Sequence, residues 1–519
     1  MKALSSRWKP KRKAFALLLV LVIIVPIGFA GYALLERAVG ARQISRGKAE
    51  ICRRHLALES GVEIAKHYAE EQRVSRLPLE GLLPGFLAET NGTRELLGYP
   101  VDILLPDRNH GNHAVSMGER IGLEDLSGRL NINCLPLEHH RRMEAWNRLK
   151  AIPGMTRETA EAILDWMDED DIPSEFGAET DFYRMQESPV MPRQGRISRI
   201  EEMLAIRGVT KELLLGSESS GKPSPQDDRY RDDLPWCRYL TLRGAVSNLL
   251  PNGEPKINLN DNDLVRLYDA LDRSLGPEIA RFVVALRLVG TTEVQVEAQI
   301  RQSTQREPSA RQTAPQIARL RALSQLGQSQ TSSVVKGNNS ANQPRRTRGG
   351  LNLERNATYQ IKSLLDLVET RVRIDINHKE EVLVSPWRST SENLAEALRR
   401  VDDIVAFTDD HTSNEKINIA VAGRPVLMTI PGMTSELAGH ILGCGGKHTA
   451  FYDTLKYMNK EELRKIRDIS GYVAFHGNVY KGVSVVSRGT PFAREMEFTI
   501  DSSRIPAILL ESSERGPEH

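Results

Sequence analysis

The 519-residue sequence is poor in cysteine and lacks the short motifs of common enzyme classes. No two of its four cysteines form a C-x-x-C pair, which excludes a zinc ribbon and a thioredoxin-like motif. These residues are Cys52, Cys134, Cys237 and Cys444. Two interpretations remain, buried free thiols or disulfides whose pairing the sequence does not give. A Gly-x-Ser-x-Gly motif, a P-loop and a His-Glu-x-x-His motif are all missing, so we predict that the protein is not an enzyme.

Acidic side chains are also missing from the first 35 residues. Six basic residues precede a run of 22 uncharged residues at positions 14–35, namely Lys2, Arg7, Lys9, Lys11, Arg12 and Lys13. A helix of that length spans about 33 Å, enough to cross the ~30 Å hydrocarbon core of a bilayer. Because basic residues stay on the cytoplasmic side, we expect a cytoplasmic N-terminus and export of everything after Leu35.

Three interpretations of this start are open. A cleaved signal peptide has the same basic head, but its apolar stretch usually has only about 7 to 15 residues. A plain signal anchor is the second. In the third, the span continues as one long helix, because the stretch from Ile27 to Leu77 contains no proline and many good helix formers. The face of that helix which a globular domain would cover includes Leu56, Val62, Ile64, Ala65 and Tyr68.

The length and charge of the remaining chain predict several globular domains. A chain of 519 residues is too long for one compact core, so two to four domains are expected. Without the six basic leader residues the formal net charge falls from +2 to −4. This mildly acidic balance argues against a general nucleic-acid binder.

Pattern and composition predict an α+β fold. A transmembrane helix continues into a long helix, helical-hairpin modules follow, and a β-meander closes the chain. Two stretches rich in small and polar residues are predicted to be a linker and a disordered tether. The predicted segments are a basic leader (1–14), the transmembrane helix (15–35), the rest of the long helix with a first strand, a hairpin module and an acidic loop (36–216), a linker (217–235), a second module (236–300), the tether (301–350), and a third hairpin module with the C-terminal strands (351–519).

A short phrase recurs three times along the chain. Each copy has a basic residue, an apolar residue, Asn and another apolar residue, and the copies are Arg129–Asn133, Lys256–Asn260 and Lys416–Ala420. A Pro-Gly turn follows the first and third copies, at Pro153 and Pro431. We interpret the repeat as a short strand in which Asn turns the chain into a helical hairpin.

The Pro-Gly hairpins have two interpretations. Helix-hairpin-helix modules use such a turn to present backbone N–H groups to a DNA phosphate, and basic residues flank it. Around Pro153 the sequence has Lys150 and Arg157 against Glu158, Glu161 and a run of acids. Phosphate binding is therefore disfavoured, although a membrane-anchored helix-hairpin-helix protein that binds DNA stays the alternative function.

That run of acids, from Asp165 to Tyr183, is the strongest candidate site. It begins at a predicted helix end and continues through a loop with Pro and Gly, so several carboxylates can converge. Calcium prefers six to eight hard oxygen ligands in flexible geometry, and such a loop suits it. The spacing is not that of an EF-hand, and solvated acids with a helix cap are the other interpretation.

The start of the chain resembles the class III signal of type IV pilins and type II secretion pseudopilins, in which a short basic leader precedes a long, half-buried helix. The resemblance implies that a prepilin peptidase cuts between Ala14 and Phe15 and that the new N-terminus is methylated. Most members have Gly before the cut and Glu at the fifth mature position, where this sequence has Ala14 and Leu19. The K-type minor pseudopilin typically lacks that glutamate.

The acidic stretch is similar to the same K-type family, which carries Asp-Trp-x-Asp-x-Asp-Asp-x-Pro followed by Gly-Ala-Glu-x-x-Tyr-Tyr. The matching positions here are Asp165, Trp166, Asp168, Asp170, Asp171, Pro173, Gly177, Ala178, Glu179, Phe182 and Tyr183. Family members bind calcium in this region, with a structural rather than a chemical role. The ligands that the resemblance implies are Asp168, Asp170, Asp171, Glu179 and Asp181.

The resemblance also implies a function and partners. The protein would be a single-pass inner-membrane protein with its bulk in the periplasm, placed at the tip of the type II secretion pseudopilus. Its partners would be the minor pseudopilins of the I and J types, the prepilin peptidase and the inner-membrane platform of the secretion system, and no nucleic acid. A carboxylate in lipid is costly, so other subunits keep theirs to pair with a neighbour's N-terminal amine, which Leu19 does not allow. An anchored adaptor with neither filament nor DNA is a third possibility.

Overall fold

The computed structural model describes residues 12–75, 93–106, 122–216, 228–291, 347–376, 379–388, 391, 393–445, 451–452, 455, 460–487 and 493–515. The leader before Arg12, most of the predicted linker 217–235 and most of the predicted tether 301–350 lie outside these residues. The described part combines helices with mainly antiparallel strands, which confirms the predicted α+β fold.

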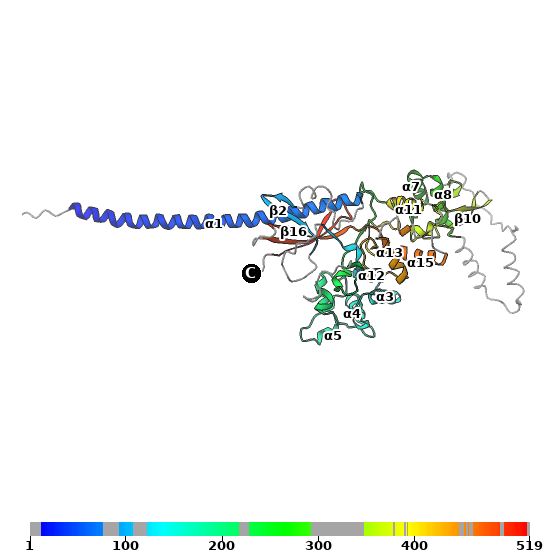
Figure 1. Cartoon of the computed structure of the whole chain (residues 1–519), viewed down its shortest axis with the longest axis horizontal. Helices are drawn as coiled ribbons and strands as arrows, with labels where there is room; N and C mark the ends of the chain where they lie inside the picture. The colour runs from blue at the N-terminus through cyan, green and yellow to red at the C-terminus, as the bar shows by residue number, and fades with distance from the viewer. Residues whose placement is uncertain are drawn as a thin grey trace, which may run out of the picture.

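One helix, α1 (Arg12–Ser75), runs unbroken for 64 residues. Figure 1 shows it projecting from the globular part as an isolated rod. Of the helices that the structure describes, α1 is the one that is long and apolar enough to cross a membrane, and its most apolar stretch is not buried. The predicted continuation of the span into one long helix is therefore confirmed.

The C-terminal end of α1 packs on a sheet. Its buried residues Leu58, Val62, Ala65 and Ala69 recur at helical spacing and contact a core that includes Phe498. Leu56, predicted to lie on this face, is instead 45% exposed, because it lies about 200° around the helix from Leu58. The strands follow the order β1 (Thr93–Leu96), β2 (Tyr99–Leu104), β16 (Val479–Val486), β17 (Arg494–Asp501) and β18 (Ile508–Arg515), and β3 (Glu124–Asp125) pairs with β16.

Strands β16, β17 and β18 form the predicted C-terminal meander. Strand β16 also pairs with β2, from Val483 opposite Leu104 to Val486 opposite Val101. The meander therefore belongs to the sheet that carries α1, whereas the predicted segment 351–519 groups it with the third hairpin. Segments far apart in the sequence pair here, and no local sequence pattern shows such a long-range pairing.

Three modules of one design lie between β3 and β16. Each begins with a short strand that contains the repeated Asn, continues through two helices, and ends with a strand that pairs in parallel with the first. Module 1 (130–241) has β4 (Leu130–Asn131), α3 (Arg142–Lys150), α4 (Arg157–Met167) and β5 (Leu240–Thr241). Module 2 (257–406) has β7 (Ile257–Asn258), α7 (Leu264–Leu275), α8 (Pro277–Val289) and β12 (Val405–Ala406). Module 3 (417–474) has β14 (Ile417–Asn418), α12 (Arg424–Leu427), α13 (Ser435–Gly443) and β15 (Val473–Ala474).

The repeated asparagine turns the chain in the same way in all three modules. The side-chain oxygens of Asn131, Asn258 and Asn418 each accept a hydrogen bond from the backbone N–H two residues later, at 3.1, 2.9 and 3.0 Å. This local turn ends the strand after two residues and starts the path into the helices. The predicted strand, turn and hairpin unit is confirmed.

Further elements complete the modules and the links between them. In module 2, a β-hairpin of β10 and β11 precedes α11. The last four residues of the predicted tether, 347–350, form β8 and a turn, so that end of the tether is folded. The remaining elements are η1 (Leu126–Gly128), η2 (Ile132–Cys134), η3 (His139–Arg141), α5 (Thr180–Arg184), η4 (Ile200–Ala205), α6 (Lys211–Leu215), η5 (Asp228–Tyr230), η6 (Trp236–Arg238), β6 (Val246–Ser247), β8 (Thr347–Arg348), β9 (Leu351–Asn352), η7 (Leu364–Leu367), β10 (Arg371–Ile376), β11 (Lys379–Val384), α11 (Leu394–Ile404), β13 (Thr412–Ser413) and α15 (Lys460–Ser470).

Two adjacent acids of β3 attach the modules to the sheet. The carboxylate of Glu124 contacts Arg129 and Arg238, each at 2.6 Å, which stand at the beginning and end of module 1. The carboxylate of Asp125 accepts a 2.8 Å hydrogen bond from Asn418 of module 3. Burial alone would raise the pKa of Glu124, but the two guanidinium groups lower it to about 2.

Module 3 contacts both other modules. The hydroxyl of Tyr472 donates to Glu144 of α3 at 3.1 Å, and the guanidinium of Arg148 lies over the Tyr472 ring. On the other side, Arg467 of α15 donates to the carbonyls of Leu365 and Val368 in module 2. In Figure 1 the helices of module 3 accordingly lie between those of modules 1 and 2.

All four cysteines lie in described residues, and none forms a disulfide. Cys52 is exposed on α1, and the other three are half-buried. The predicted burial of the cysteine side chains is wrong for Cys52, which lies on the solvent-facing side of α1.

Candidate metal centre

Helix α4 places three acids on one face, toward the loop that follows it. Thr156 caps the start of the helix by accepting a hydrogen bond from the N–H of Thr159, and Asp168 is its C-terminal cap. Glu161, Asp165 and Asp168 follow one another at intervals of four and three residues. At 3.6 residues per turn this spacing aligns their side chains.

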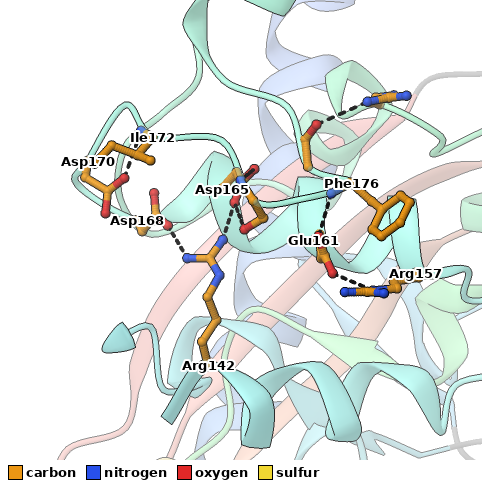
Figure 2. Close-up of polar contacts among 11 residues, drawn as sticks. Arg142, Arg157, Glu161, Asp165, Asp168, Asp170, Ile172 and Phe176 are labelled. Carbon is orange, nitrogen blue, oxygen red and sulfur yellow. Dashed lines mark hydrogen bonds and ion pairs between the residues drawn. The ribbon is translucent and has the colours of Figure 1, made fainter. Parts of the chain in front are cut away.

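Two of these acids hold the acidic loop by its backbone. Asp165 is fully buried and accepts hydrogen bonds from both the N–H (3.0 Å) and the hydroxyl (2.7 Å) of Ser174. Glu161 accepts the N–H of Phe176 at 2.7 Å and pairs with Arg157 at 2.8 Å. Figure 2 shows the loop fixed above α4 by these contacts.

Gly177 allows the loop to approach α4 closely. A Cβ atom at this position would lie 1.7 Å from the Oδ2 atom of Asp165, so only glycine fits without displacing the carboxylate. The carbonyl of Gly177 accepts a 3.1 Å hydrogen bond from Arg207, in the segment that follows the acidic loop. The loop is therefore held by α4 on one side and by Arg207 on the other.

The carboxylates of Asp165, Asp168 and Glu179 converge, and one oxygen from each lies within 4.8 Å of the others. Glu179 is only 3% exposed. Within the described part of the chain, neither of its carboxylate oxygens has a hydrogen-bond partner, and the same holds for Oδ1 of Asp168. Unpaired buried carboxylate oxygens are costly, and they are the hard ligands that calcium takes. The three residues therefore fit a divalent cation with a preference for oxygen.

The electrostatics of this cluster point the same way. Burial and the neighbouring carboxylates, Asp168 first among them, raise the pKa of Glu179 to about 8. Burial raises the pKa of Asp168 to about 6 despite its contact with Arg142, and burial also raises the pKa of Asp165. Three acids that resist ionisation together would be stabilised as carboxylates by a cation placed among them.

The predicted ligands divide into two groups. Asp168 and Glu179 are brought together, whereas Asp170, Asp171 and Asp181 are exposed and lie outside the cluster. Asp170 accepts the N–H of Ile172 at 2.9 Å and Asp171 that of Thr180 at 3.3 Å, so both shape the loop. The sequence-based prediction missed Asp165 as a member of this cluster, although its spacing from Asp168 on a helix was the available signal.

The predicted processing site and the first Pro-Gly turn also lie in described residues. Ala14 and Phe15 lie in the first turn of α1. The carbonyl of Pro153 in the first Pro-Gly turn accepts a 2.8 Å hydrogen bond from the indole of Trp236. That turn is thereby tied into the core of module 1.

Comparison with known proteins places this site in a family. No curated protein matches the chain. The family model described as type II secretion system (T2SS), protein K, matches residues 128–216, which run from the first Asn phrase through α6 and contain the whole acidic loop. Residues 128–216 therefore match the type II secretion system protein K family, and this match supports a role in type II secretion.

Proposed function

We propose that this protein is the K-type minor pseudopilin at the tip of the type II secretion pseudopilus, where it assists protein export across the outer membrane. Helix α1 anchors it in the inner membrane with the N-terminus in the cytoplasm and the bulk of the chain in the periplasm. Its partners are the I-type and J-type minor pseudopilins and the inner-membrane platform. The family match and the long apolar helix support this assignment.

The observation that carries the tip position is the insertion of three modules into one small sheet. The sheet and α1 form a compact unit, but the modules between β3 and β16 extend well beyond it, as Figure 1 shows. Subunits that repeat along a thin filament must leave room for neighbours on all sides. A subunit with this added bulk fits best at an end, where one side is open.

Residue 19 supports the same position. Leu19 is exposed on α1 and carries no charge, so it offers no carboxylate to the N-terminal amine of a neighbouring subunit. Within lipid an acidic side chain is costly unless it is paired in this way or serves another function. A subunit without it does not need a neighbour on that side of the filament.

The metal centre has a structural role in this proposal. Asp165, Asp168 and Glu179 would hold calcium, which would neutralise the buried carboxylates and fix the acidic loop on α4. The hydrogen bonds from Ser174 to Asp165 and from Phe176 to Glu161 already orient the loop, so calcium would add rigidity rather than chemistry. This stiff loop would give module 1 a defined surface.

The N-terminus of the mature protein tests the assignment most directly. In cells that contain a prepilin peptidase, mass spectrometry of the purified protein should find a chain that begins with methylated Phe15. Cells that lack the peptidase provide the control and should retain the leader. An intact Met1 in the presence of active peptidase, or a start near Leu34, would contradict the proposal.

A further inference from the structure

A basic side chain lies inside the candidate metal centre. Arg142, the first residue of α3, donates hydrogen bonds from Nη2 to Oδ1 of Asp165 and from Nη1 to Oδ2 of Asp168. Its side chain is only 20% exposed. Figure 2 shows the guanidinium reaching from α3 across to α4 and bridging the two carboxylates. Two of the three candidate ligands are thus held by a cation that belongs to the chain itself.

Arg142 only partly satisfies the cluster. It brings one positive charge to three carboxylates, and both oxygens of Glu179 and Oδ1 of Asp168 have no partner in the described residues. A guanidinium has five N–H donors and no hydrogen-bond acceptor, and it stays protonated in proteins. It can therefore neither ligate a metal ion nor be discharged to make room for one.

A divalent cation and Arg142 would compete for the same oxygens. The three carboxylates lie within 4.8 Å of one another, so an ion among them would lie close to the guanidinium. Two like charges at such a distance repel strongly in a partly buried site. Binding of the ion would require that Arg142 release at least one of its two carboxylates.

We propose that Arg142 is a built-in competitor of the metal ion, which holds Asp165 and Asp168 together when no ion is bound and lowers the affinity of the site. This inference rests on the calcium site of the proposed function. Arg142 belongs to α3, and its two partners lie on α4 and at its C-terminal cap. Exchange of the arginine for an ion would therefore break hydrogen bonds that join the two helices. Arg142 is a positioning residue whose effect is on affinity.

The test is a calcium titration of the full-length protein in detergent, by calorimetry, with wild type and Arg142→Gln. The variant removes the charge and leaves a shorter, polar side chain. We expect Arg142→Gln to bind calcium about tenfold more tightly than wild type, or better, and to have a lower melting temperature than wild type in chelator. Arg157→Gln is the matched control, since Arg157 pairs with Glu161 and Glu175 of the same region but with none of the three ligands. Its calcium affinity should stay within about twofold.

The outcomes separate the competitor from the calcium site. If wild type binds calcium and Arg142→Gln binds it equally or more weakly, Arg142 orients the ligands and the inference is overturned, while the calcium site stands. If only Arg142→Gln binds calcium, the competitor is supported and a resident calcium in the natural protein is excluded. If neither binds calcium, both claims fail.

A second variant covers the case in which Arg142→Gln does not fold. Arg142→Lys keeps the charge, but an ammonium does not bridge two carboxylates as a planar fork does. We expect its calcium affinity to lie between those of wild type and Arg142→Gln. An affinity at or below that of wild type would overturn the inference.

Discussion

The side-chain amide of Asn133 and the backbone of Ile197 form two reciprocal hydrogen bonds, each 2.9 Å long. The same amide also donates to the carbonyl of Leu242, at 3.2 Å. In module 2, Asn260 repeats the arrangement with the N–H and carbonyl of Ile361 and with the carbonyl of Phe407. Each asparagine therefore joins the first strand of its module to a distant segment and to the end of the return strand.

Loss of either asparagine should destabilise its module. Asn133→Ala and Asn260→Ala each remove three hydrogen bonds and leave backbone groups near buried residues unpaired, at an expected cost of about 3 kcal/mol. Urea unfolding of the full chain measures this, with Asn252→Ala as the control. Asn252 is exposed, and its side chain bonds Glu254 alone among the residues that the structure describes, so a change below about 0.5 kcal/mol is expected there. Equal losses in all three variants would contradict the role given to the two asparagines.

Glu124 should make stability depend on acidic pH. Its pKa is about 2 in the folded protein, below the value of about 4.3 in an unfolded chain. The ionised group therefore stabilises the fold above about pH 4.3, and this contribution, up to about 3 kcal/mol, is lost as the pH falls toward 2.

Glu124→Gln tests this dependence. The variant should be less stable than wild type at neutral pH, and its free energy of unfolding should fall less than that of wild type as the pH is lowered. Urea unfolding across the pH range measures both. Glu187→Gln at an exposed position controls for the loss of a charge alone. A profile of Glu124→Gln parallel to that of wild type would rule out the linkage between Glu124 and its two arginines.

Calcium should raise the melting temperature of the protein through Asp168 and Glu179. A ligand that binds only the folded state, at a free concentration of 100 times its Kd, adds about 2.7 kcal/mol to the free energy of unfolding. We therefore expect calcium to raise the melting temperature by several degrees. Asp168→Asn and Glu179→Gln should abolish this rise, whereas Asp181→Asn, on an exposed residue of the same loop, should keep it. In chelator Glu179→Gln should be at least as stable as wild type, because a buried unpaired carboxylate is removed.

The wider ligand set that the family resemblance implies has its own test. Replacement of Asp170 and Asp171 together by Ala should lower the melting temperature only when calcium is present, if these acids ligate it. An equal loss in chelator would show instead that they act through the loop hydrogen bonds to Ile172 and Thr180.

Gly177→Ala should disturb the site without any change of charge. The new methyl group would meet the carboxylate of Asp165, so loop or helix must shift, at an expected cost of about 2 kcal/mol. The calcium-dependent rise in melting temperature should shrink as well. Gly195→Ala is a suitable control in the same module, because its nearest atom would be 3.9 Å away, at the carbonyl of Arg193. Identical stabilities of the two variants would argue against close packing at Gly177.

Much of the fold could be predicted because its signals are local. The absence of proline after Pro26 predicted the length of α1. The Asn phrase predicted where each module begins. The return strands β5, β12 and β15 could not be predicted, since each has two residues, too few for a periodic pattern.

The candidate site shows the same division. Asp168 and Glu179 are among the ligands that the family resemblance implied, within a stretch that composition had marked as acidic. Arg142 lies on another helix, and no pattern links it to the acidic loop before the chain folds. Asp165 looked like one more acid of a solvated run, but it is fully buried.

The pairing of β2 with β16 has a consequence for how the protein is made. The strand next to β2, β16, follows all three modules in the chain, so the sheet stays open until the modules have been synthesised. Until then the apolar stripe of α1 around Leu58 and Val62 has no cover, while the modules can close on themselves as each return strand emerges. Ribosomes that stop early would thus release anchored chains with finished modules and a bare helix, ready targets for quality-control proteases.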